Sequence, residues 1–193
     1  MSSQVPGYQM EGIMNGMKQI LAIGPAKKLF IMMCGIAGSG KTTLSKAIMS
    51  LNPMIWTRLS IDEIIAEKHG LYNKDYRESE FEAYQTEAEL EFRRRLDAWL
   101  ADSLIGHGLI LDRSFCSRKD RDEFRKIIEQ GDAESRLVYL EAEKEVLWQR
   151  ICDRGDIIKD ANSALDISRD LFEAYVASFD RPANEQEHKI SAV

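Results

Sequence analysis

The chain has 193 residues, a length that suits one domain with a single hydrophobic core. With 44% hydrophobic and 30% charged residues, it has the composition of an ordinary soluble globular protein. The formal net charge of −6 argues against nonspecific binding to nucleic acid, because proteins that grip phosphate backbones usually carry a basic stripe.

Cysteine spacing and hydropathy give an expectation for the cellular compartment. The three cysteines, Cys34, Cys116 and Cys152, are widely spaced and form neither a disulfide framework nor the paired ligands of a zinc site. The longest apolar stretches fall far short of the roughly 20 residues that a membrane helix needs. We therefore expect a cytoplasmic protein that does not associate with membranes.

Residues 1–28 are expected to form an extension ahead of the main domain, which would span residues 29–193. A transit peptide is disfavoured, since the extension contains Glu11 and no arginine. Its apolar side chains recur at helical spacing and predict a short amphipathic helix packed on the domain or on a partner chain: Met10, Ile13, Met14, Met17, Ile20 and Leu21.

A glycine-rich motif follows directly on the apolar run of residues 29–34. Residues 35–42 read Gly-Ile-Ala-Gly-Ser-Gly-Lys-Thr, a full match to G-x-x-x-x-G-K-[ST]. Glycines let successive N–H groups turn inward around an anion, and the following helix adds its positive N-terminal end. The motif predicts a P-loop that binds a nucleoside triphosphate, whereas a plain glycine-rich turn leaves the Lys-Thr pair unexplained.

Each part of the predicted P-loop has an expected role. Lys41 would reach the β- and γ-phosphates, Thr42 would hold Mg²⁺ through its hydroxyl, and Thr43 would contact the α-phosphate. The backbone cradle is expected from four residues: Gly35, Gly38, Ser39 and Gly40.

Strands and helices alternate along the rest of the chain. Residues 70–79 read as a polar, tyrosine-bearing loop able to flex over a substrate. We expect helices over residues 41–50, 80–105, 118–130, 143–152 and 166–179, and strands over 55–60, 108–112 and 136–141. This alternation predicts a three-layer α/β sandwich with a parallel sheet and the ligand crevice at the carboxyl ends of its strands.

Two acids are expected at that crevice, because Asp62 and Asp112 each end a predicted strand. Asp112 is the candidate that orients Mg²⁺, directly or through water. Asp62 is then free to accept the proton of an attacking hydroxyl and to position that oxygen. The alternative for Asp62 is a helix N-cap.

Arginines on two later segments have different expected roles. Arg150 and Arg154 lie one helical turn apart and are expected to stabilise charge on a transferring phosphoryl group, with residues 156–163 as a lid; the alternative is salt bridging to Asp153 and Glu145. The run 93–95 is three successive arginines, which point in different directions around a helix. We interpret it as a solvated face paired with Glu89 and Glu91.

The chain resembles P-loop kinases of the polynucleotide kinase and zeta-toxin type. The resemblance rests on residues 35–43, on Leu-Ser-Ile-Asp-Glu at 59–63, on Leu-Ile-Leu-Asp at 109–112 and on Arg-x-x-x-Arg-Gly at 150–155. It implies ATP as donor, Asp62 as the acid that activates the hydroxyl, Arg150 and Arg154 as lid arginines, and a sheet order of 2-3-1-4-5 with a short last edge strand over residues 189–193.

Two departures from the polynucleotide kinase pattern bear on the acceptor. Ile65 stands where that pattern has a phosphate-gripping arginine, and Arg-Ser-Phe follows Asp112 in place of small hydroxyl and amide residues. The favoured function is therefore transfer of the γ-phosphate of ATP to a hydroxyl of a small molecule. Two alternatives stay open: a polynucleotide 5′-hydroxyl kinase with a basic channel, and a regulatory ATP-binding module without an acceptor. The channel would use Arg93, Arg94, Arg95, Arg118 and Arg121.

Overall fold

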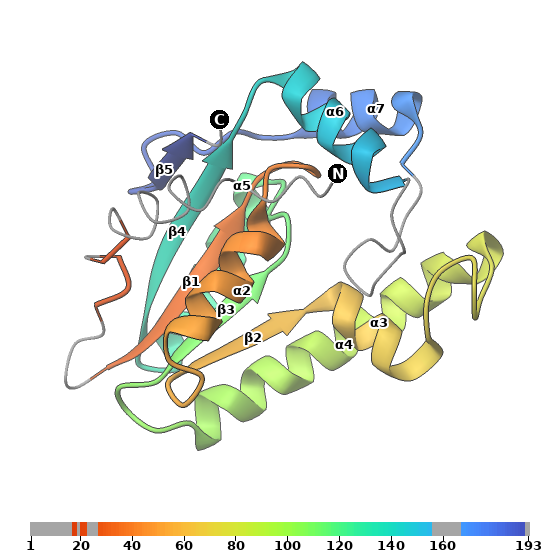
Figure 1. The fold of residues 1–193 in the computed structure, drawn as a ribbon. Coiled ribbons are helices and arrows are strands. Elements are labelled where there is room, and N and C mark those ends of the chain that lie inside the picture. The colour runs from red at the N-terminus through yellow and green to blue at the C-terminus, as the bar shows by residue number, and fades with distance from the viewer. Residues whose placement is uncertain (1–16, 19, 23–26, 156–166, 192–193) are drawn as a thin grey trace.

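Five parallel strands form the central sheet of the protein (Figure 1). The computed structural model describes residues 17–18, 20–22, 27–155 and 167–191. The strands lie in the order β2-β3-β1-β4-β5, which confirms the predicted order. Their bounds are β1 (Lys28–Cys34), β2 (Trp56–Ser60), β3 (Gly108–Asp112), β4 (Ala133–Glu141) and β5 (His188–Ser191).

Helices cover both faces of this sheet, as the predicted three-layer sandwich requires. Phe30 and Met32 of β1 belong to the hydrophobic cluster that α4 and α5 cover, whereas Leu29 and Ile31 belong to the cluster beneath α2. This alternation follows from the strand geometry, in which successive side chains point to opposite faces. The helices are α2 (Lys41–Leu51), α3 (Ile61–His69), α4 (Glu78–Asp102), α5 (Arg118–Gln130), α6 (Lys144–Gly155) and α7 (Arg169–Ser178).

The last two helices form a pair beyond the carboxyl end of β4 (Figure 1). The rings of Trp148 in α6 and Phe172 in α7 have centroids 5.4 Å apart, and Arg169 bonds to Glu145 across the pair at 3.0 Å. We call α6 and α7 together the helix pair. It faces α3 and the first turns of α4, so that the carboxyl ends of β1 and β3 lie between two helical elements.

The segment before α4 differs from its prediction as a loop able to flex over a substrate. Tyr72 and Tyr76 are only 6% and 5% exposed, and both belong to the core cluster. Their rings pack edge-on against Phe81 and Tyr84, respectively. Two buried aromatic side chains therefore anchor this segment to α4. Hydrophilic neighbours conceal that anchoring in the sequence.

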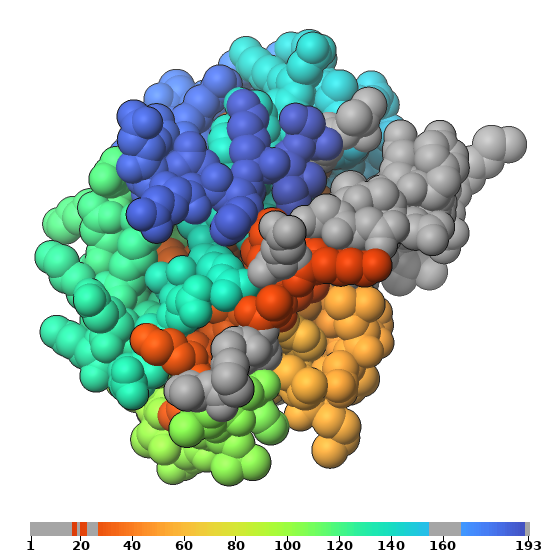
Figure 2. All heavy atoms as spheres, turned by 90° about the vertical axis from the view of Figure 1, so that its left-hand side faces the viewer, coloured from red at the N-terminus to blue at the C-terminus, as the bar shows by residue number. Residues whose placement is uncertain are grey.

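Part of the N-terminal extension is visible on the surface between α2 and the C-terminal segment (Figure 2). Met17 and Ile20 are buried in the cluster beneath α2, and an Arg136 guanidinium nitrogen of β4 donates to the Ile20 carbonyl. The helix predicted over residues 10–21 falls largely outside the described residues. None of the helices in the described ranges combines the length and apolar character that a membrane span requires.

Candidate active site

The predicted P-loop joins the end of β1 to the start of α2 and has the backbone of an anion cradle. Gly38 and Gly40 have φ angles of 86° and 95°, in the left-handed region that L side chains rarely adopt. A Cβ on Gly38 would lie 2.6 Å from the carbonyl oxygen of Leu147 in α6. The glycine therefore serves two needs, because it permits the turn and lets the helix pair approach the loop.

Polar side chains of the P-loop are arranged around this cradle. Lys41 donates to the carbonyl of Ile36 at 3.0 Å, which curls the side chain over its own loop. Burial lowers the pKa of Lys41, while the charge of Asp112 opposes that shift. The hydroxyl of Ser39 is buried and has no hydrogen-bond partner among the described residues. A buried ammonium and an unsatisfied hydroxyl at a helix N-terminus fit an anion with several oxygens, such as a polyphosphate.

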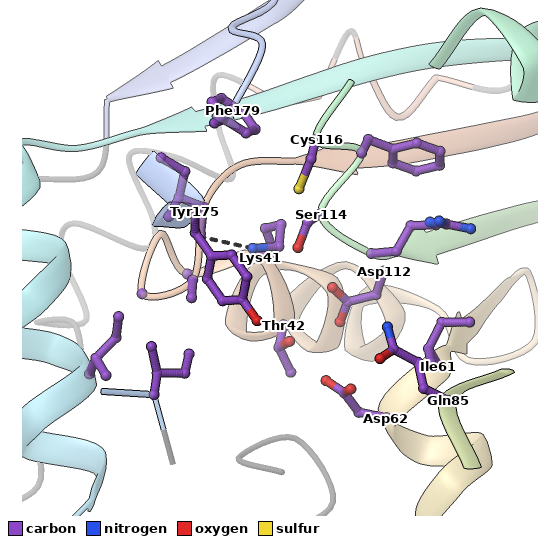
Figure 3. A pocket seen from close by; sticks show the side chains of 18 of the residues that line it. Lys41, Thr42, Ile61, Asp62, Gln85, Asp112, Ser114, Cys116, Tyr175 and Phe179 are labelled. Atoms are coloured by element: carbon purple, nitrogen blue, oxygen red, sulfur yellow. Dashed lines mark hydrogen bonds between the residues drawn. The ribbon is translucent and has the colours of Figure 1, made fainter. Parts of the chain in front are cut away.

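A cavity of about 870 Å³ opens beside the P-loop (Figure 3). Its walls come from the P-loop, the first turns of α3 and α4, the loop after β3, and the helix pair. Thr42, Asp62 and Asp112 all point into the same space in Figure 3. The cavity therefore contains the expected phosphate-binding, metal-binding and proton-accepting side chains together.

Asp62 lies in this cavity, but not at the end of a strand as predicted. Strand β2 ends at Ser60, which is the N-cap residue of α3, and Asp62 occupies the first turn of that helix. The N-cap alternative for Asp62 is therefore wrong. Burial raises the pKa of the Asp62 carboxyl to about 6, and the nearby charge of Asp112 adds to that shift. A carboxyl with this pKa is suited to accept and release a proton near neutral pH.

Asp112 ends strand β3 as predicted and has a partner that the sequence did not reveal. Arg58 of β2 donates to its Oδ2 atom from Nε at 2.8 Å, and a second guanidinium nitrogen lies 2.6 Å from that same oxygen. Arg58 also donates to Glu63. Adjacent pairing of Ser60 with Asp112 in the sheet explains the contact, because Arg58 lies two residues earlier on the same face of β2.

The arrangement fits a magnesium ion bound jointly by protein and polyphosphate. The described residues contain no cluster of three or more His, Cys, Asp or Glu side chains able to hold a metal alone. Thr42 and Asp112 both line the cavity beside the phosphate cradle. These residues suit Mg²⁺, which is commonly bound through one or two protein groups together with substrate phosphates.

The two predicted arginines both lie near the P-loop but contribute differently. Arg154 lines the cavity, and its Nε donates to the carbonyl of Arg150 at 3.2 Å. Arg150 donates to the carbonyl of Gly38 at 3.4 Å, which links α6 to the cradle. Their proposed acid partners have other contacts, since Glu145 bonds to Arg169 and Asp153 accepts from Gln149. The lid predicted over residues 156–163 lies outside the described residues.

The five arginines suggested for a nucleic-acid channel are ion-paired or buried, and Arg118 among them pairs with Asp122. The three arginines of α4 are paired on its outer surface, where Arg94 and Arg95 bond to Glu91 and Arg93 bonds to Glu123. The predicted pairing with Glu91 is confirmed, whereas the predicted pairing with Glu89 is wrong, because Glu89 bonds to Arg113. Arg121 is completely buried and cannot contact a bound polymer.

Buried Arg121 instead anchors the segment that follows the helix pair. Its guanidinium bonds to Glu185 at 2.6 Å and donates to the carbonyls of Phe115 and Asp180 at 2.9 and 2.8 Å. The amide of Asp180 donates to the carbonyl of Cys116 at 2.9 Å, and its carboxylate accepts from the backbone of Arg118. We call this set of contacts the Asp180 junction. It ties the end of α7 to the loop after β3.

Several cavity residues were missed in the sequence. Phe81, Gln85 and Glu89 recur every four residues along α4 and therefore share one face of the helix, which lines the cavity. The loop after β3 and α7 add further lining residues. Four-residue spacing could have revealed the α4 face, but not which side of the helix met the cavity. The missed residues with polar side chains are Gln85, Glu89, Arg113, Ser114, Ser117, Asp120, Ser168 and Tyr175.

A comparison with known families identifies the architecture. A family model described as an AAA domain matches residues 30–182, which include the P-loop, both acids and both arginines of the candidate site. The chain belongs to this family. No curated protein matches the sequence of this AAA-domain protein.

Solved structures share the fold of this AAA-domain protein at low sequence identity. A putative kinase from Chloroflexus aurantiacus J-10-fl is 19% identical, with a TM-score of 0.64 over 87% of each chain. A gluconokinase from Sinorhizobium meliloti 1021 is 17% identical, with a TM-score of 0.53 over 88% of this chain and 84% of that one. Chaetomium thermophilum Kti12 in complex with ADP-AlF3 is 13% identical, with a TM-score of 0.58 over 84% and 88%. These likenesses show that the chain shares its fold with these three proteins.

Proposed function

We propose that the protein is an ATP-dependent phosphotransferase that moves the γ-phosphate of ATP to a hydroxyl of a small-molecule acceptor. One observation carries the proposal: the carboxyl of Asp62, with its pKa raised to about 6, shares a cavity with a complete P-loop. A module that only binds nucleotide needs no such acid, and one that only hydrolyses nucleotide needs no additional space for a second molecule. A polynucleotide acceptor is disfavoured because the candidate channel arginines are paired or buried.

Each side chain of the cavity would have its own role in phosphoryl transfer. Lys41 and the P-loop amides would hold the phosphates, and Arg154 would neutralise charge that develops on the departing γ-phosphoryl group. Mg²⁺, held through Thr42 and Asp112, would supply further neutralisation of phosphate charge. Asp62 would accept the proton of the acceptor hydroxyl and orient its oxygen toward phosphorus.

A transfer assay tests this proposal. The protein is incubated with [γ-³²P]ATP and Mg²⁺ in the presence of pooled hydroxylated metabolites or of oligonucleotides with a 5′-hydroxyl, and labelled products are separated. We expect label on a small molecule. Label on the oligonucleotides would identify a polynucleotide kinase, and hydrolysis alone across all pools would favour the regulatory module.

Matched variants connect the activity to the cavity. Asp62→Asn removes the proposed base and is expected to lower transfer by about 10² to 10⁴. Asp97→Asn is the control, because Asp97 is an exposed carboxylate of α4 that is not among the lining residues. Equal transfer by the two variants would assign the raised pKa of Asp62 to its burial alone and would leave the protein without the proposed base.

A further inference from the structure

The half of the cavity away from the P-loop has a distinct charge. It is bounded by α3, the inner face of α4 and the start of α5, and we call it the acceptor half. Its ionisable lining residues are Asp62, Glu89, Arg113 and Asp120. The other basic lining residues in the described part of the chain, Lys41 and Arg154, belong to the P-loop and α6. Three carboxylates in the acceptor half thus face one guanidinium.

That single guanidinium is already engaged. Arg113 bonds to Glu89 at 3.1 Å and lies 3.5 Å from the carboxylate of Asp120. Its guanidinium also lies over the Phe124 ring, 4.9 Å from the centroid, and its side chain is only 18% exposed. To recruit Arg113, an anionic acceptor would have to displace two carboxylates and leave them unpaired beside it. The acceptor half is therefore poorly suited to a negatively charged molecule.

The remaining groups suit hydroxyls and an ammonium. The amide of Gln85 points into the space between Asp62 and Asp112 in Figure 3, where it can both donate to and accept from hydroxyl groups. Glu89 has a side chain 37% exposed and a carboxylate that is only partly satisfied by Arg113, so it can accept an additional donor. Phe81 adds an apolar surface on the same helical face.

From this charge pattern we infer that the acceptor is a hydroxylated amine, which places its ammonium near Glu89 and Asp120 and its reacting hydroxyl near Asp62. The inference rests on the proposed function for the reacting hydroxyl, but its charge preference concerns binding alone. An amine of this kind gains charge-assisted hydrogen bonds to the carboxylates. A carboxylate or phosphate at the same place meets like charge.

Binding is tested by calorimetry on the full chain loaded with ADP and Mg²⁺, using acceptor sets that differ in charge but share a skeleton. One set is 2-amino-1,3-propanediol, glycerol and glycerate. A second is glucosamine, glucose and gluconate, and a third is 2-deoxystreptamine, myo-inositol and myo-inositol 1-phosphate. We expect the amine to bind most tightly in at least one set and the anion most weakly in every set. Tighter binding of any anion than of its amine, or no binding of any amine at millimolar concentration, would overturn the inference.

A pair of variants tests whether the ammonium of the acceptor lies at Glu89. Glu89→Gln is expected to weaken binding of the amine by about tenfold and of its neutral analogue by much less. Glu82→Gln is the control, since Glu82 is an exposed glutamate of α4 outside the cavity lining. If Glu89→Gln weakens amine and neutral analogue equally, the ammonium does not lie at Glu89 and the inference is wrong.

The same sets, assayed with [γ-³²P]ATP, separate this inference from the proposed function. Glu89-dependent binding of an amine without phosphoryl transfer would leave the charge preference intact and would contradict the phosphotransferase. Transfer to a sugar acid or a phosphorylated polyol would confirm the phosphotransferase and would contradict the charge preference.

Discussion

Arg58 aims two of its guanidinium nitrogens at one oxygen of Asp112, the Oδ2 atom, at 2.8 and 2.6 Å. Both side chains are almost completely buried, with exposures of 2% and 3%. The contact fixes the orientation of the Asp112 carboxylate. Arg58 is thus a positioning residue for the proposed metal ligand.

Removing Arg58 is expected to destabilise the fold strongly. Arg58→Leu leaves the buried carboxylate of Asp112 without its partner, and breaking a buried ion pair in this way costs about 3 to 5 kcal/mol. Urea denaturation measures the loss. The control is Arg94→Leu, which breaks a pair whose arginine side chain is 69% exposed and is expected to cost far less. Similar losses of stability in both variants would mean that the buried Arg58–Asp112 pair contributes no more to folding than the exposed pair does.

Lys41→Ala should separate nucleotide binding from folding. The wild-type protein is expected to gain about 2.7 kcal/mol of stability at an ATP concentration near 100 times Kd, and the variant only a small part of that gain. Thermal unfolding with and without ATP and Mg²⁺ gives the comparison. Lys46→Ala, an exposed position on the same helix, should retain the full gain. Retention of that gain by Lys41→Ala would be inconsistent with a P-loop lysine on the phosphates.

Asp62→Asn is expected to reduce activity and raise stability. The pKa of Asp62 is raised to about 6 by burial and by the charge of Asp112, so its ionised form, the active base, is populated above that pH. The wild-type kcat/KM should therefore fall as pH drops through about 6, and the residual activity of the variant should lack this limb.

The Asp62→Asn substitution is expected to raise the free energy of unfolding, whereas it lowers activity. Because the folded state binds the proton of Asp62 more tightly than the unfolded state does, the carboxylate destabilises the fold fully above pH 6 and not at all below the unfolded pKa. The asparagine variant should be about 1 to 3 kcal/mol more stable at pH 8 and show almost no gain near pH 4. Denaturation at the two pH values checks this. A gain that is independent of pH would show that ionisation of Asp62 is not its cause.

Arg154→Lys tests where charge develops during transfer. If Arg154 acts on the departing phosphoryl group, its loss should lower kcat by at least about tenfold and change the KM for ATP much less, since an ammonium lacks the planar fork of a guanidinium. Arg150→Lys should behave similarly but more mildly, because Arg150 contacts the carbonyl of Gly38. Steady-state kinetics decides between outcomes: a rise confined to KM would make Arg154 a contact to bound ATP in its ground state.

The predicted elements were most accurate where local signals mark both ends. Strand β3 and helix α5 have the predicted bounds, since Gly108 and Asp112 bracket an apolar run and Gly131 caps the helix. Strand β4 begins three residues earlier than expected, because Glu134 and Ser135 pair with β1 although they are polar. Pairing by backbone hydrogen bonds leaves no mark in the hydrophobic pattern.

The residues of the candidate site also differ in whether a local sequence signal predicts them. The P-loop residues follow from a contiguous motif with a defined backbone requirement, and their chemistry could be assigned before the fold was known. Arg58 and Glu89 could not be assigned, because each matters through a partner distant in sequence, Asp112 for one and Arg113 for the other. Such contacts depend on strand order and helix rotation, which no local spacing specifies.

The Asp180 junction makes the two sides of the cavity into one mechanical unit. Helix α7 ends at Ser178, two residues before the amide that holds the carbonyl of Cys116, and Cys116 lies in the loop that continues into the acceptor half. Arg121 and the amide of Asp180 bond to the carbonyls of two consecutive residues of that loop, Phe115 and Cys116. The spacing between the end of α7 and this loop is therefore set by hydrogen bonds, and a substitution that removes the Arg121 guanidinium would release both segments at once.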